Sequence, residues 1–201
     1  RMVDSNLIDE YYDDARHADD AQAVDVSAED ASGIDAGLAI GEILTGAVTL
    51  PTGAPEVWTE AVRVEVENLA GEVVAEAEVD DDGTYSISGL EPEPVKVRFA
   101  VAQYWDETLH ELVTPNLLGQ WFDGVTSREQ ATTLPLGEDT FTGIDAELDL
   151  GRTISGTVSL AAGASLDPRE SLEVSAWNVD DAVGSFGYAT VDPETGAYAV
   201  T

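Results

Sequence analysis

Three consecutive aspartates, Asp80, Asp81 and Asp82, directly precede Gly83 and are the first candidates for metal ligands. Carboxylate oxygens are the ligands that calcium prefers, but a calcium loop needs about six or more oxygens at spaced positions. The related turn DPETG at 192–196 keeps the glycine and has only one of the three aspartates. A glycine with a positive φ is what a hairpin turn requires. We interpret 80–83 as a turn, keep calcium as an alternative, and predict no other cofactor.

Two pairs of adjacent aromatic residues, Tyr11–Tyr12 and Trp121–Phe122, are the candidates for ligand binding. Exposed flat rings can stack on sugar rings, which would make these pairs a glycan-binding surface. Aromatic rings also bury large apolar areas, so the same pairs can belong to the core. Exposure decides between the two: exposed rings favour a binding module, and buried rings favour a structural module.

No catalytic motif occurs in the chain. The sequence contains no His-Glu-x-x-His, Gly-x-Ser-x-Gly or P-loop pattern, and it has no cysteine. His17 and His110 have no evident partner in the sequence. Carboxylates are so frequent that no two of them stand out as the acid pair of a glycosidase. We therefore predict that the protein is not an enzyme.

The chain is strongly acidic, with 41 Asp and Glu residues against 8 Lys and Arg and a formal net charge of −33. DNA and RNA are polyanions, so this charge argues against nucleic acids as partners, and it disfavours adhesion to anionic lipid. Either adaptation to high salt or divalent cations, or an acidic secreted protein, explains the charge, and the sequence leaves both open. No apolar run approaches the 18–20 residues or so of a membrane span, so no membrane insertion is expected.

The sequence repeats itself with a period of 110 residues. Residues 3–50 align with 113–160 without gaps, and 14 of the 48 aligned positions are identical. Six of these identities lie between Gly33 and Gly41. The same offset aligns the two aromatic pairs with each other. A long fixed period is typical of a tandem array.

The period predicts three segments. Residues 1–40 are the C-terminal part of a preceding repeat, 41–150 form one complete β-sandwich repeat, and 151–201 are the N-terminal part of a following repeat. The recurring sequences GIDAGLAIGEILTG and GIDAELDLGRTISG then mark junctions, where the last strand of one repeat leads into the first strand of the next. These junctions contain no Pro- or Ser-rich linker, so neighbouring repeats are expected to have restricted freedom.

Within the repeat, apolar residues recur with a period of two, as in half-buried β-strands. Turn sequences rich in Gly, Asp, Asn and Pro separate these strands. We count about seven strands in the repeat, the number expected of a small antiparallel sandwich. The less regular segment 102–133 is expected to hold either a short helix or a long crossover loop. The strands with the clearest alternation are 62–67, 73–79, 95–101 and 144–150.

Several of these segments together resemble the carboxypeptidase regulatory-like domain, a transthyretin-like β-sandwich. The resemblance is carried by LTGAV at 44–48 and its partner ISGTV at 154–158, by AVRVEVE at 61–67, by VDDDGTYSISGLEP at 79–92 and by VKVRFAV at 95–101. It covers most of 41–101. Glu93 stands where the family usually has a glycine, which implies a wider turn there.

The resemblance implies an all-β fold of tandem transthyretin-like or immunoglobulin-like antiparallel β-sandwich repeats, about 110 residues per unit. It also implies a non-catalytic structural or adhesive module of a bacterial secreted or cell-surface protein, serving as a stalk, spacer or filament subunit. The expected partners are neighbouring repeats of the same protein or copies of itself, with cell-surface glycans as a further candidate. The alternative is a glycan-binding accessory module of a secreted polysaccharide-active enzyme, which would use the aromatic pairs.

Overall fold

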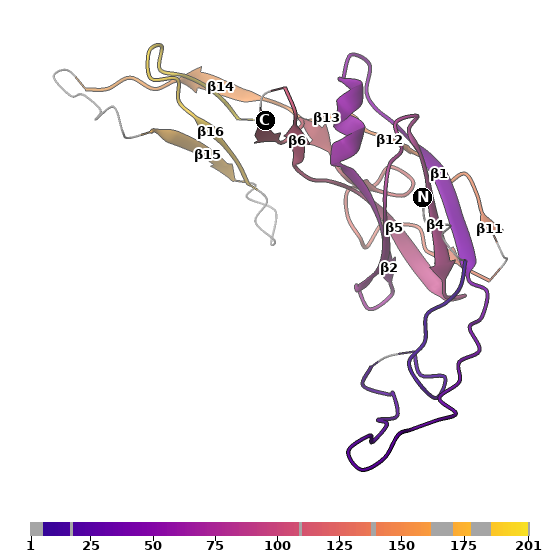
Figure 1. Cartoon of the computed structure of the whole chain (residues 1–201). Helices are drawn as coiled ribbons and strands as arrows, with labels where there is room; N and C mark the ends of the chain where they lie inside the picture. Colours follow the sequence, from indigo (N-terminus) through magenta and orange to yellow (C-terminus); the bar gives the residue numbers. More distant parts are fainter. Residues whose placement is uncertain are drawn as a thin grey trace. The chain divides into compact units, whose positions relative to one another are not determined.

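The computed structural model describes residues 6–200, with gaps at 17, 109, 138–139, 162–170 and 178–185. The fold is all-β, with 44% of the residues in strands and 3% in helix. The chain divides into two compact units, Arg1–Asp149 and Leu150–Thr201 (Figure 1). Among the described residues, no helix is both long and apolar enough to cross a membrane.

The first sheet of unit 1 is built around β1 (Glu42–Thr49). On one side β1 pairs antiparallel with β4 (Thr84–Leu90). On the other side it pairs in parallel with β11 (Thr140–Phe141) and then with β12 (Ala146–Glu147). The beginning and the end of the segment 41–150 therefore lie side by side in one sheet (Figure 1).

The second sheet of unit 1 has the order β10-β5-β2-β3, and β9 also pairs with β5. Its central strands have the predicted alternation, because Val62, Val64 and Val66 are buried while their neighbours Arg63 and Glu65 are partly exposed. The strands are β2 (Val62–Asn68), β3 (Val73–Glu78), β5 (Pro94–Val101), β9 (Gln120–Trp121) and β10 (Leu134–Pro135).

One apolar core joins the two sheets in a β-sandwich-like arrangement. Its largest fully buried side chain is Phe99 on β5, and the ring of Tyr85 on β4 meets it edge to face with the centroids 6.0 Å apart. Such pairs stabilise a core beyond the area that they bury. The rest of the cluster is mostly aliphatic and includes Leu44, Val62, Val64, Val66, Val97 and Leu148.

Two details of local structure differ from the expectations. Of the two alternatives for segment 102–133, the short helix is wrong for its described residues: the segment forms the hairpin of β6 (Tyr104–Asp106) and β7 (Glu111–Val113), then β8 (Leu117–Leu118), β9 and turns. Val73 is exposed, although the alternation of 73–79 points it inward. The reason is an irregularity in the β2–β3 register between Val66 and Glu67, which shifts the phase of β3 at its first residues.

A short 3₁₀ helix, η1 (Glu56–Ala61), connects β1 to β2 and was not predicted. Pro55 precedes it with a φ of −60°, which suits the start of a helical turn. Trp58 of η1 packs against the core from outside. Six residues are too few to give a recognisable helical period in the sequence.

The N-terminal segment 6–40 is joined to the rest of unit 1 at its two ends. Leu7 and Ile40 form an antiparallel bridge. Asn6 donates from Nδ2 to the carbonyl oxygen of Gly41 at 2.6 Å, and its Oδ1 accepts from Gly89 N at 2.8 Å. Residues 22–40 between these anchors are all exposed.

Unit 2 repeats the strand pairing of unit 1 at the same register. Its strand β14 (Ile154–Thr157) pairs with β17 (Ala197–Val200) so that Gly156 faces Tyr198, as Gly46 faces Tyr85 in the β1–β4 pair. Val158 N donates to Gly196 O at 2.8 Å, and Val48 N donates to Gly83 O at 2.7 Å. Both glycines have a positive φ.

The second pair of strands in unit 2 also has the same register as its counterpart in unit 1. Strand β15 (Glu173–Trp177) pairs antiparallel with β16 (Phe186–Thr190). Val174 faces Ala189, and in unit 1 Val64 faces Ala77 in the β2–β3 pair. The aligned residues of the sequence therefore occupy corresponding places in the strands.

Local geometry also recurs between 6–40 and 116–150. Tyr11 bridges Ala15, and Trp121 bridges Val125, so each aromatic pair opens a tight turn of the same length. Asp13 and Asp123 have φ values of 67° and 68°. Strand β8 pairs with β13 (Asp149–Leu150), at the positions that correspond to the bridge between Leu7 and Ile40.

Candidate functional site

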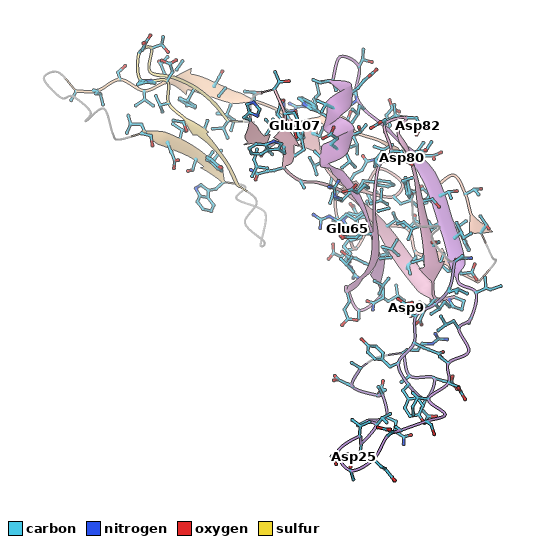
Figure 2. The ribbon with its side chains drawn as sticks, viewed as in Figure 1. Asp9, Asp25, Glu65, Asp80, Asp82 and Glu107 are labelled. Atoms are coloured by element: carbon cyan, nitrogen blue, oxygen red, sulfur yellow. The ribbon has the colours of Figure 1, made fainter. Side chains whose placement is uncertain are left out.

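The aspartates of 80–83 form a tight turn that leads from β3 in the second sheet to β4 in the first, with Gly83 N donating to Asp80 O at 2.8 Å. The turn is present as predicted, but it is not a hairpin, because β3 pairs with β2 and β4 pairs with β1. Figure 2 shows Asp80 and Asp82 at this turn. Oδ1 of Asp82 accepts hydrogen bonds from Thr84 N at 3.0 Å and from Thr84 Oγ1 at 2.6 Å. These two bonds hold the pKa of Asp82 below its usual value, and the bond from the Thr84 hydroxyl has the larger effect. Within the described part of the chain, no group of three or more His, Asp or Glu side chains is arranged to hold a metal ion.

The four aromatic candidates differ in exposure. Trp121 is 7% exposed, and Phe122 packs against the core of unit 1. Tyr11 is 51% exposed, and Tyr12 is half-buried. Each pair belongs to its own turn. The pair Trp121–Phe122 therefore offers packing area and no flat exposed platform.

A site that the sequence analysis did not single out lies along the outer edge of β1. Here β1 and Tyr85 hold the segment 143–148, and we call this edge the strand-docking site. It consists of Thr45, Gly46, Ala47 and Thr49 of β1 together with Tyr85 of β4. Ile144 N donates to Thr45 O at 3.2 Å, and Leu148 N donates to Thr49 O at 2.9 Å.

Glycine is required at the centre of the strand-docking site. A Cβ atom built on Gly46 would lie 2.1 Å from the carbonyl oxygen of Ile144 and 3.0 Å from Cε1 of Tyr85. No side chain fits that space, so only glycine lets the docked strand approach. The sequence signal for this residue is the Gly that recurs at 46 and 156.

Two side-chain hydrogen bonds lock the docked segment. The hydroxyl of Tyr85 donates to Ile144 O at 2.6 Å, and Ala47 N donates to Oδ1 of Asp145 at 2.8 Å. Burial, followed by the negative charge of Asp145, raises the pKa of Tyr85 well above its usual value. The phenol therefore stays protonated and remains a donor over the physiological pH range.

A second polar cluster ties a loop to the other sheet. The guanidinium of Arg128 donates to Oε2 of Glu67 at 2.7 Å and to Asn68 O at 2.8 Å. Lys96 of β5 lies opposite Glu67 of β2, and its Nζ donates to Arg128 O at 2.6 Å. Glu67 is buried, so this carboxylate depends on its cationic neighbours. The donors and acceptors of this cluster satisfy one another, so its role is to hold the loop at Arg128 against the sheet.

Comparison of the chain with protein-family models, with curated proteins and with solved structures gave no match. The resemblance to the carboxypeptidase regulatory-like domain therefore stays a prediction. The strand-docking site is the feature with the most specific geometry in the described residues, and its chemistry is recognition of an extended peptide backbone.

Proposed function

We propose that this protein is a non-catalytic structural module of a tandem β-sandwich array, with about 110 residues in each repeat. Segment 1–40 is the end of one repeat, 41–150 is a complete repeat, and 151–201 is the start of the next. The shared register of the β1–β4 and β14–β17 pairs supports this division. The two matching turns that Tyr11 and Trp121 open support it as well.

The parallel pairing of the first and last strands of the complete repeat carries the functional proposal. The chain enters at the start of β1 and leaves at the end of β12, which runs in the same direction beside it. Tension along the chain therefore slides the two strands past each other. Their hydrogen bonds bear the load together, whereas an antiparallel hairpin pulled from one end opens one bond at a time. A module built in this way resists stretching.

The arrangement suits a stalk, a spacer or a filament subunit, and we place it in a secreted or cell-surface protein. Its partners are the neighbouring repeats or copies of itself. The glycan-binding alternative receives less support, because the ring of Trp121 is buried and its neighbour Phe122 packs on the core. Exposed pairs of rings on one face would have favoured it.

Single-molecule stretching of the full chain, held at its two termini, tests the proposal. Unfolding of 42–147 should appear as one force peak that releases about 35 nm, at about 3.3–3.6 Å per residue. Asp145→Ala should lower the peak force, because it removes the acceptor for Ala47 N. The matched control Asp149→Ala removes one exposed charge and should leave the peak unchanged. A chain that lengthens gradually with no resolved peak contradicts the load-bearing function.

A further inference from the structure

The contact that joins segment 6–40 to the two strands β1 and β4 is centred on Asn6. The side chain of Asn6 uses both of its polar atoms: Nδ2 donates to Gly41 O at 2.6 Å, and Oδ1 accepts from Gly89 N at 2.8 Å. The main-chain oxygen of Asn6 accepts from Gly41 N at 3.1 Å. Gly41 directly precedes β1 and Gly89 lies near the end of β4, so one asparagine holds the two strands together at this end.

Glycine is required at both positions that Asn6 contacts. A Cβ atom built on Gly89 would lie 2.8 Å from Leu7 O, and one built on Gly41 would lie 2.6 Å from Cα of Gly89. No side chain fits in either place, so the main chains approach one another only with glycine at 41 and 89. We call the surface that Gly41 and Gly89 form the asparagine socket.

The contact extends beyond Asn6 to two neighbouring side chains. Ile8 is 4% exposed, and among the described residues of 6–40 it is the only buried one. Arg16 reaches Glu91, directly after β4, at 3.8 Å, but both side chains are 40% exposed, so this ion pair contributes about 1 kcal/mol or less. The asparagine and the buried isoleucine therefore carry the contact.

In the division into repeats proposed above, the two sides of the contact belong to different repeats. Residues 6–8 correspond to 116–118 in the repeat 41–150. There Leu117 is buried in the core, and Trp121 close behind it pairs with β5. The segment that carries the asparagine is thus part of the body of its own repeat. Gly89 belongs to the body of the following repeat, so the contact runs from one body to the next.

We propose that the asparagine socket is the joint between consecutive repeats, and that its partner is the Asn-Leu-Ile segment at the end of the preceding repeat. This inference rests on the proposed function, because it needs the division into repeats. The first residues of β1 pair with the last of β4, as Glu42 does with Leu90, and Asn6 bonds to both strands only when they are paired. The joint therefore closes on a folded neighbour, fixes the orientation of the two repeats and stiffens the array.

The sequence signal of the joint is an asparagine followed 35 residues later by a glycine, and it recurs with the period of the array. Asn116 stands at the position of Asn6, and Gly151 stands at the position of Gly41. The recurrence is expected if every joint uses the same two residue types. It is not expected of a contact that is peculiar to segment 6–40.

Distances between two spin labels on the full chain test the inference. The chain has no cysteine, so Asp9→Cys and Asp81→Cys give two unique labelling sites, and both positions are exposed. Asp9, which is labelled in Figure 2, directly follows Ile8, and Asp81 lies in the turn before β4. The labelled parent should give one narrow distance distribution. Asn6→Ala should broaden it, because both side-chain bonds are lost.

The matched control for Asn6→Ala is Asn68→Ala. Asn68 also takes part in two side-chain hydrogen bonds, but both are with Glu72 in the turn between β2 and β3. The substitution is the same and leaves the socket intact, so the distance distribution should stay narrow.

Two glycine substitutions test the socket from its other side. Gly89→Ala should broaden the distribution as Asn6→Ala does, since the new methyl group meets Leu7 O. Gly124→Ala is its control, because Gly124 has a similar φ, 71° against 76°, and a Cβ atom built on it has no atom within 4 Å. Both variants carry the strain of a positive φ, so a difference between them reports the contact.

Amide hydrogen exchange distinguishes a lost joint from a lost fold. Gly89 N should exchange about tenfold faster in Asn6→Ala than in the parent, because it loses its acceptor. The amides of β2 and β5 should keep their rates, since the core between the sheets does not include Asn6.

Two results overturn the inference. One is a parent whose distance distribution is as broad as that of Asn6→Ala. The other is a distribution that Gly89→Ala broadens no more than Gly124→Ala does. If either occurs while 42–147 still gives its force peak, the inference fails alone and the proposed function stands. If the peak is absent, the proposed function fails, and a socket that still holds is then a contact within one domain, which overturns the joint as well.

Discussion

The hydroxyl of Tyr85 donates a buried hydrogen bond of 2.6 Å to the main-chain carbonyl oxygen of Ile144, which lies 59 residues further along the chain. This bond joins β4 to the strand segment on the far side of β1. It crosses the backbone of β1 at Gly46, where no side chain can stand. One side chain thereby holds three segments of the sheet in register.

Tyr85→Phe should destabilise unit 1 by about 1–3 kcal/mol, because the buried carbonyl of Ile144 loses its donor. Equilibrium denaturation by urea measures this change. Tyr11→Phe is the matched control, since the Tyr11 ring is exposed, and its effect should stay within about 0.5 kcal/mol. Equal effects of the two substitutions would show that the bond contributes little.

Arg128→Ala should destabilise the protein by about 1–3 kcal/mol, because Glu67 is buried and loses a charged donor at 2.7 Å. Arg98→Ala is the control. Arg98 meets Glu65 at 3.4 Å on the surface, and a pair of this kind is worth about 1 kcal/mol or less. Urea denaturation of both variants compares them, and the prediction is wrong if Arg98→Ala costs as much as Arg128→Ala.

The charged face of the second sheet makes a specific prediction about salt. Glu65 on β2, which is labelled in Figure 2, lies directly opposite Glu76 on β3. Like charges at such opposed positions destabilise a sheet. Arg63 lies opposite Glu78 and pairs with it at 2.9 Å, so this second position is compensated. Arg98 meets Glu65 at 3.4 Å from the β5 side, so Glu76 is the member of the Glu65–Glu76 pair that faces a like charge and gains nothing from Arg98 directly.

Glu76→Lys should raise the stability by a few tenths to about 1 kcal/mol in 0.1 M NaCl. The gain should shrink in 1 M NaCl, where screening weakens charge interactions. Thermal melting at the two salt concentrations measures both effects. Glu29→Lys changes the net charge equally in the exposed segment 22–40 and serves as the control. The parent protein itself should melt at a higher temperature in molar salt, and a flat melting temperature would exclude self-repulsion as an important term.

The turn at 80–83 should contribute less to stability in acid. Hydrogen bonds from Thr84 lower the pKa of Asp82 in the folded state below its ordinary value of 3.8. A depressed pKa stabilises the fold above the ordinary value, and this contribution is lost as the pH falls through the folded pKa. Asp82→Ala should therefore lower the melting temperature at pH 7 and have a smaller effect in acid, once the pH has fallen below the lowered pKa of Asp82 in the folded state.

Asp81→Ala is the control for that experiment, because it removes an exposed carboxylate from the same turn. It should have little effect at either pH. A loss of stability in Asp82→Ala that is as large in acid as at neutral pH would assign the effect to something other than the ionised carboxylate.

The sequence by itself determined the all-β class, the phase of the best strands and the recurrence that aligns β1 with β14. Alternation of apolar and charged residues is enough to orient β2 and β5, because one face of each strand is buried. It misplaced Val73, where an irregular register shifts the phase, and it gave no sign of η1. The irregularity depends on the partner strand, which a local pattern does not describe.

Only the tertiary structure decided which residues meet. Glu67 has the pattern of an outward-facing acid, yet it is buried against Arg128, a residue 61 positions away. The parallel docking of 143–148 on β1 likewise depends on Gly46, Tyr85 and Asp145, which lie far apart in the sequence. Alternation with a period of two indicates which side of a strand faces inward. It does not state which neighbour fills an edge, because that choice is made by hydrogen bonds and close contacts between distant segments.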